Sequence, residues 1–136
     1  GIGQTLFRAT PLLFAGLVLV ALTAGASIPV AHYGDAAYPT IYDNLDGPGQ
    51  DWLDYHAELA ATWLPLLCAN AVLAVLAIVV GVARRRLLPW AALLVALVTL
   101  AGSGGAAVVA RAGGQIQHPE FRLGDPPEVE SSRRPR

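Results

Sequence analysis

Apolar and charged residues occupy separate long blocks along this chain of 136 residues. Three stretches, residues 11–28, 59–83 and 87–110, contain no Asp, Glu, Lys or Arg. A helix needs roughly 17–25 mostly apolar residues to cross the about 30 Å of hydrocarbon in a bilayer. The pattern therefore predicts an all-α integral membrane protein with three transmembrane helices, over about residues 9–31, 51–84 and 87–112.

The composition of the chain agrees with this interpretation. Hydrophobic residues make up 54% of it and charged residues only 14%, whereas about 25% of a typical soluble domain is charged. A chain of this length has room for one small membrane domain, which we expect over residues 1–123. The segment 124–136 is rich in Pro and charged residues, has little to pack, and is predicted to be a flexible tail.

The distribution of arginines predicts the orientation. Arg8 precedes the first span, and Arg84, Arg85 and Arg86 fill the short connection between the second and third spans. The segment 32–58 carries only acidic charges. Because basic connections stay on the cytoplasmic side, we expect the N-terminus inside and the C-terminus outside, with an acidic outer loop over residues 32–50, in a multi-pass protein of the bacterial inner membrane.

The first apolar stretch also resembles a secretory signal, because a basic residue precedes it and the small residues 24–26 could form a cleavage site. The apolar stretch continues to Ala31, which is longer than a usual signal core. We therefore interpret it as a retained span.

Turn-forming residues and aromatic residues delimit the second span. Pro, Gly, Asn and Asp recur between residues 29 and 49, so no long helix is expected before Gln50. From Asp51 onward, aromatic and apolar residues follow a helical spacing. Trp and Tyr collect at membrane–water interfaces, which predicts four interfacial anchors: Trp52, Tyr55, Trp63 and Trp90.

Small residues predict where the helices touch. Lipid provides no hydrophobic drive between helices, so close backbone approach has to hold them together. The predicted packing positions, several of them four residues apart, are Ala21, Gly25, Ala77, Gly81, Gly102, Ala106, Ala110 and Gly114. Asn70 lies near the bilayer centre, where an unpaired amide is costly, so it is expected to hydrogen-bond another helix of this chain or of a partner.

Three histidines form the one constellation with candidate chemistry. His32 ends the first span, His56 begins the second and His118 follows the third, so all three are expected at the outer face. Imidazole commonly ligates metals and haem iron, which leaves a haem b or metal site open. No two of these histidines share a helix face at i, i+4 spacing, and solvated or hydrogen-bonded interfacial histidines are the favoured interpretation.

Residues 113–122 read Gly-Gly-Gln-Ile-Gln-His-Pro-Glu-Phe-Arg. This stretch resembles the end motif of small uncharacterised bacterial multi-span membrane proteins that finish in a Gly-Gly-x-Ile-Arg-His-Pro-Glu-Ile-Arg pattern, with Gln117 replacing Arg and Phe121 replacing Ile. His56 matches a histidine before an inner span of those proteins, so the resemblance covers the second half of the chain. It implies an outer segment in which Gly-Gly breaks the helix and Pro119 keeps the next residues extended.

These observations favour a non-catalytic accessory subunit of a larger bacterial bioenergetic assembly, such as a photosynthetic reaction-centre complex or a respiratory complex. Its expected partners are other integral membrane subunits and lipids, and no nucleic acid; pigment contacts stay open. The alternative is a membrane electron-transfer protein that binds haem b or a metal through the outer histidines. A transporter is disfavoured, because three spans offer no repeat and almost no intramembrane ionisable group.

Overall fold

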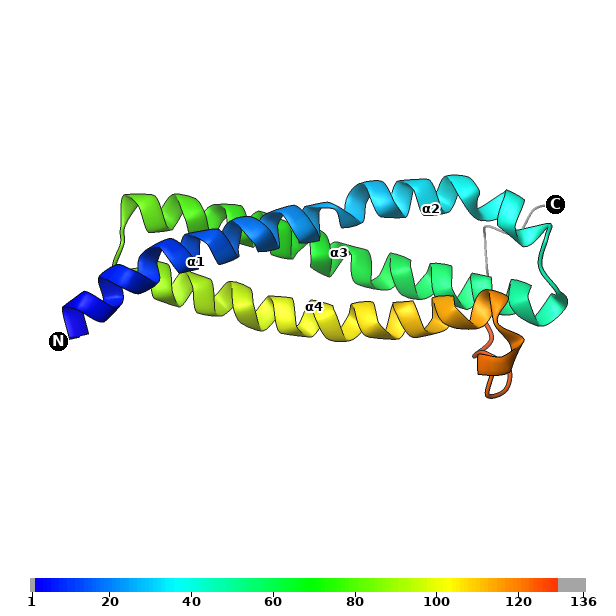
Figure 1. Cartoon of the computed structure of the whole chain (residues 1–136). Coiled ribbons are helices and arrows are strands. Elements are labelled where there is room, and N and C mark those ends of the chain that lie inside the picture. Colours follow the sequence, from blue (N-terminus) through cyan, green and yellow to red (C-terminus); the bar gives the residue numbers. More distant parts are fainter. Residues whose placement is uncertain (1, 130–136) are drawn as a thin grey trace. The chain divides into compact units, whose positions relative to one another are not determined.

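The computed structural model describes residues 2–129, with side chains from residue 10 onward. Within this part of the chain all regular structure is helical (Figure 1): α1 covers Ile2–Gly25, α2 Ser27–Tyr42, α3 Gly47–Ala83 and α4 Leu88–Gln117, and the short 3-10 helix η1 covers Pro119–Phe121. Three helical segments are long and apolar enough to cross a membrane: Thr10–Tyr42, Gly47–Ala83 and Leu88–Gln117. The prediction of an all-α protein with three candidate spans is confirmed.

A single residue, Ala26, separates α1 from α2. Pro29 has no N–H to donate to the carbonyl of Gly25, so one helical hydrogen bond is missing at this point. Just before this point the chain stays hydrogen-bonded, because the amide of Ala26 donates to Leu22 O at 2.9 Å and the hydroxyl of Ser27 donates to Ala24 O at 2.6 Å. The first candidate span therefore combines α1 and α2.

The expectation of a long irregular loop over residues 32–50 is wrong. Helix α2 continues to Tyr42, and only residues 43–46 connect it to α3. Gly and Pro inside a helix cost about 1 and 3 kcal/mol relative to Ala, yet α2 accommodates both Gly34 and Pro39. Tertiary packing outweighs these propensities: Tyr38, between them in sequence, is 3% exposed and packs in a core with Leu53 and Ile116.

The junction between α2 and α3 is closed by side chains. The Gln50 amide donates to Tyr42 O at 3.0 Å, and the Asn44 amide donates to Thr40 O at 2.7 Å, which satisfies carbonyls at the end of α2. At the start of α3, the carboxylate of Asp46 accepts the backbone N–H of Gly49 at 3.1 Å, which is the bond expected of an N-cap residue. Helix α3 consequently begins four residues before the predicted start at Asp51.

The end of α4 also differs from the prediction. Gly113 and Gly114 do not break the helix, which continues to Gln117. Pro119 disfavours helical geometry in the residue before it, and His118 accordingly has φ −118° and ψ 83°. The residues from Pro119 to Phe121 form a 3-10 turn instead of the extended stretch that was expected.

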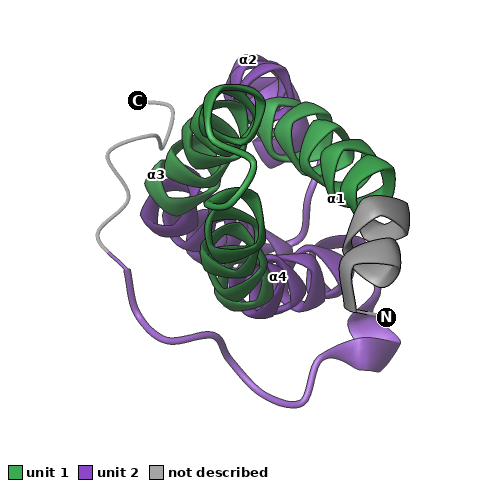
Figure 2. Ribbon diagram, turned by 90° about the vertical axis from the view of Figure 1, so that its left-hand side faces the viewer, with its two compact units in different colours: residues 1–27, 65–102 green, residues 28–64, 103–136 purple. Residues whose placement is uncertain are grey.

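The chain divides into two compact units, coloured green and purple in Figure 2. Unit 1 contains Gly1–Ser27 and Pro65–Gly102, and unit 2 contains Ile28–Leu64 and Ser103–Arg136. The core of unit 1 is formed by Leu17, Ala74, Ala77, Leu88 and Val95. The core of unit 2 is formed by Tyr38, Leu53 and Ile116. A single membrane domain over residues 1–123 stays a prediction, and the predicted tail lies partly outside the described residues, which end at 129.

Candidate functional site

In unit 2, a cluster of hydrogen bonds joins the α2–α3 connection to the segment after α4. The guanidinium of Arg122 forms two hydrogen bonds with the carboxylate of Asp46, Nη1 to Oδ2 at 2.6 Å and Nη2 to Oδ1 at 2.9 Å. The same guanidinium donates to Gln115 O at 2.8 Å and to Ile116 O at 2.6 Å. One arginine thus pairs with the N-cap of α3 and satisfies two carbonyls at the end of α4.

The charges of this cluster stabilise one another. The hydrogen bonds from Arg122 hold the pKa of the Asp46 carboxyl below its usual value, although partial desolvation opposes the shift. The bond to Asp46 raises the pKa of Arg122 in turn. The side chain of Arg122 is only 10% exposed, whereas that of Asp46 is 52% exposed. The arginine is therefore the enclosed member of the pair.

Gly49 is required by the close approach of these segments. A Cβ at this position would meet Asp46 Oδ1 at 2.5 Å and the backbone oxygen of Ile116 at 2.9 Å. The second neighbour is backbone and cannot rotate away. The glycine therefore lets the first turn of α3 lie against the last turn of α4, where Arg122 joins them.

The three histidines belong to unit 2 but have separate surroundings. His56 Nδ1 is 2.9 Å from Val109 O, and its ring lies against Gly113. His118 Nδ1 is 3.0 Å from Glu120 Oε1, on an exposed surface. His32 is exposed and makes an edge contact with Tyr33. Among the described residues, no group of three or more His, Cys, Asp and Glu side chains is arranged to hold a metal ion.

Among the described residues, Glu120 forms an ion pair with one of these histidines, His118. Its own backbone N–H lowers the pKa of its carboxyl, and the hydrogen bond with His118 lowers it further. Among the described residues, no ion pair joins Glu58 to Arg111.

Two buried polar contacts join helices inside the candidate spans. In unit 1, Asn70 is 2% exposed, and its amide nitrogen donates to Thr99 Oγ1 at 3.0 Å on α4. Its amide oxygen is buried and has no hydrogen-bond partner in the described part of the chain. In unit 2, the hydroxyl of Tyr38 on α2 donates to the carboxylate of Asp54 on α3, and both residues are almost fully buried.

The predicted packing residues divide into enclosed and exposed groups. In unit 1, Ala77 and Gly81 are buried, and Gly102 lies against Leu67. Ala21 packs at the edge of the core of unit 1, while Gly25 has no atom within 4 Å of an added Cβ. In the α4 part of unit 2 the remaining members are all exposed: Ala106, Ala110 and Gly114.

The face of α4 that packs inside unit 2 is a different one. A Cβ on Gly105 would overlap the indole of Trp63, Val109 O meets the imidazole of His56, and Ile116 is 8% exposed. The sequence pattern did not predict this face, because it combines a glycine, Gly105, with a large apolar residue, Ile116. The contact at Gly105 becomes apparent only when the position of Trp63 on α3 is known.

The predicted aromatic anchors have unequal environments. Trp90 is 71% exposed, as a lipid-facing anchor can be. Trp63 is partly buried against Gly105. Trp52 and Tyr55 contact each other edge to face, with ring centroids 5.9 Å apart. Of the topology residues, Arg84, Arg85 and Arg86 are exposed in the turn between α3 and α4.

In comparisons with known proteins, no family model, curated protein or solved structure matches the chain. The resemblance of residues 113–122 to a bacterial end motif thus stays a prediction.

Proposed function

We propose that the chain is a non-catalytic accessory subunit of a larger membrane assembly. The observation that carries this proposal is the row Ala106, Ala110 and Gly114 on α4. These small residues recur every four positions, yet they lie outside the face that α4 uses within unit 2. Rows of this kind let two helix backbones approach closely in lipid, where van der Waals contact drives association.

The outward-facing surface of the three candidate spans supports the same proposal. In the most apolar window of each span, only 11%, 22% and 17% of the residues are buried, in chain order. Most apolar side chains therefore face lipid or another protein. On α4, the small side chains of the row favour contact with another helix over contact with disordered acyl chains.

We further propose that the assembly is a bacterial bioenergetic complex of the inner membrane, either a photosynthetic reaction-centre complex or a respiratory one. The exposed triplet Arg84–Arg86 supports an orientation with this turn in the cytoplasm and the acidic α2–α3 connection outside. A subunit of this kind contributes helix surface and leaves redox chemistry to its partners.

Purification from native membranes in mild detergent tests the proposal. The double variant Ala106→Leu with Ala110→Leu should reduce recovery of the chain in the assembly at least several-fold, because two bulky side chains would separate the helices. Gly104→Leu is the matched control, since Gly104 is exposed, has no atom within 4 Å of an added Cβ and lies about 160° around the helix from Ala106. Equal recovery of the two variants would contradict the proposal.

The absorption spectrum of the same preparations separates the alternative function. A stoichiometric haem b signal from the isolated chain would support the alternative, a membrane electron-transfer protein. In that case His56→Ala or His118→Ala should abolish the signal, because removing an axial ligand disrupts haem binding. The accessory-subunit proposal predicts no haem signal from the separated chain.

A further inference from the structure

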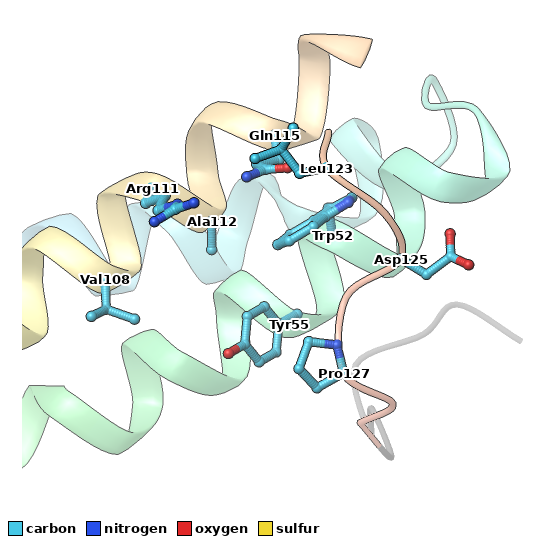
Figure 3. A pocket seen from close by; sticks show the side chains of 9 residues that line it. All are labelled: Trp52, Tyr55, Val108, Arg111, Ala112, Gln115, Leu123, Asp125 and Pro127. Carbon is cyan, nitrogen blue, oxygen red and sulfur yellow. The ribbon is translucent and has the colours of Figure 1, made fainter. Parts of the chain in front are cut away.

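Unit 2 contains a partly open cavity of about 280 Å³ between the first turns of α3, the last turns of α4 and the segment after η1. Figure 3 shows Trp52 and Tyr55 entering it from α3, Arg111 and Gln115 from α4, and Asp125 on the segment that passes alongside. Gln115 also takes part in the Arg122–Asp46 cluster, but through its backbone oxygen and not through its side chain. The other residues named here belong neither to that cluster nor to the exposed row on α4, so the cavity borders the cluster but is lined by other side chains.

Two polar atoms at this cavity have unmet hydrogen-bonding capacity. Gln115 is 6% exposed, and its amide oxygen is buried without a hydrogen-bond partner among the described residues. The indole N–H of Trp52 is buried and unpartnered in the same way. Figure 3 shows the Gln115 amide beside the indole of Trp52. A buried acceptor and a buried donor without partners cost free energy, so a ligand that supplies both complements would be favoured.

Two residues of opposite charge also line the cavity, Arg111 and Asp125. No hydrogen bond or ion pair joins Arg111 or Asp125 to another described residue, although both line the cavity. They come from α4 and from the later segment, respectively. Figure 3 shows the exposed carboxylate of Asp125 turned outward from that segment, so it reaches a ligand in the cavity by rotating about its side-chain bonds. A guanidinium and a carboxylate on two sides of a cavity complement a ligand that carries one negative and one positive charge.

The position of the cavity along α4 also favours a ligand with an apolar part. Val108, one turn before Arg111, forms part of the wall and belongs to the uncharged stretch 87–110. A ligand whose charged group lies at Arg111 can therefore continue along the apolar surface of the span. Trp and Tyr side chains at the same level are typical of the interfacial zone, where lipid headgroups lie.

We propose that this cavity binds the headgroup of a zwitterionic aminophospholipid, of the phosphatidylethanolamine class. The phosphate pairs with the guanidinium of Arg111 and accepts the N–H of Trp52. The primary ammonium donates to the carboxylate of Asp125 and to the amide oxygen of Gln115. An anionic phosphatidylglycerol leaves Asp125 without a cation, and phosphatidylcholine has no N–H to donate, so each matches the site less well.

Native mass spectrometry of the full chain in mild detergent tests this assignment. The delipidated protein is incubated with equal amounts of phosphatidylethanolamine, phosphatidylglycerol and phosphatidylcholine, and the lipid retained per chain is identified by mass. The wild type should retain one phosphatidylethanolamine, with roughly tenfold preference over each competitor, because one charge-assisted hydrogen bond is worth about this factor.

Arg111→Gln should lower the retention of phosphatidylethanolamine roughly tenfold, as expected for the loss of one charged contact. The control Arg85→Gln removes the same charge from an exposed turn and should leave retention unchanged. Asp125→Asn, on an exposed segment outside the helices, should abolish the preference over phosphatidylglycerol. Equal retention of the three lipids, preferential retention of phosphatidylglycerol, no retained lipid, or equal effects of Arg111→Gln and Arg85→Gln would each overturn the proposal.

Discussion

Gly105 offers the sharpest test of how α3 and α4 pack in unit 2. A Cβ at Gly105 would overlap the Cδ2, Cε3 and Cε2 atoms of Trp63, which belong to a rigid ring. The adjacent Gly104 has no atom within 4 Å of an added Cβ and is exposed. The two glycines are thus neighbours on the same helix and are the same residue type. They differ in whether an added methyl group has space.

The magnitude follows from this comparison. Replacing Gly with Ala inside a helix favours the helix by roughly 0.5–1 kcal/mol, and this gain applies to both sites. Forcing an extra methyl group into a packed contact costs about 1–3 kcal/mol, and this cost applies to Gly105 alone. Gly105→Ala should therefore be less stable than Gly104→Ala by about 1–3 kcal/mol.

Reversible unfolding by titration of sodium dodecyl sulfate into mild-detergent micelles, followed by circular dichroism, measures this difference. The background Trp63→Ala should remove it, because the ring that opposes the new methyl group is then absent. If Gly105→Ala is as stable as Gly104→Ala, or if the difference persists without the indole, the packing described for Gly105 is incorrect.

Three further predictions concern charge, orientation and the buried amide. Because the pKa of Asp46 is lowered in the folded state, its pairing with Arg122 stabilises the protein above the ordinary value of 3.8, and this contribution is lost as the pH falls through the lower folded-state value; the stability gap between wild type and Asp46→Asn should close in that range of an unfolding titration. A cysteine at Gly47, in a Cys68→Ala background, should react with an impermeant thiol reagent from the periplasmic side, and neutralising residues 84–86 should give mixed labelling. Asn70→Leu should change the stability of the isolated chain by less than about 1 kcal/mol in the same unfolding assay, because the lost hydrogen bond is offset by removing an unpartnered buried oxygen.

The three candidate spans could be predicted because they depend on a local property, the length of the uncharged stretches. Helix α2 could not, because the residues that favour a loop are read locally, whereas the contacts that hold the helix are tertiary. Tyr38 bonds Asp54 and packs against Ile116, which is distant in sequence. Gly34 and Pro39 are tolerated for that reason, and no pattern within residues 29–49 reveals it.

The polar cluster of unit 2 illustrates the same limit. Asp46 and Arg122 are 76 positions apart in the chain. Taken alone, each looks like a charged residue in a solvent-exposed loop. The sequence did contain a signal for half of the cluster, since an Asp directly before the first turn of a helix is a typical N-cap. The small-residue pattern on α4 predicted Gly102 as a contact, but could not separate the enclosed face at Gly105 from the exposed row.

The central claim is that the exposed row on α4 contacts another membrane subunit, and site-specific photocrosslinking in native membranes tests it most directly. A photoreactive amino acid at Ala110 should give one protein adduct of defined mass, identified as another integral membrane subunit. The same group at Gly104, about 120° away around the helix, should give none. Protein adducts of equal yield from both positions, or adducts with lipid alone at Ala110, would contradict the account.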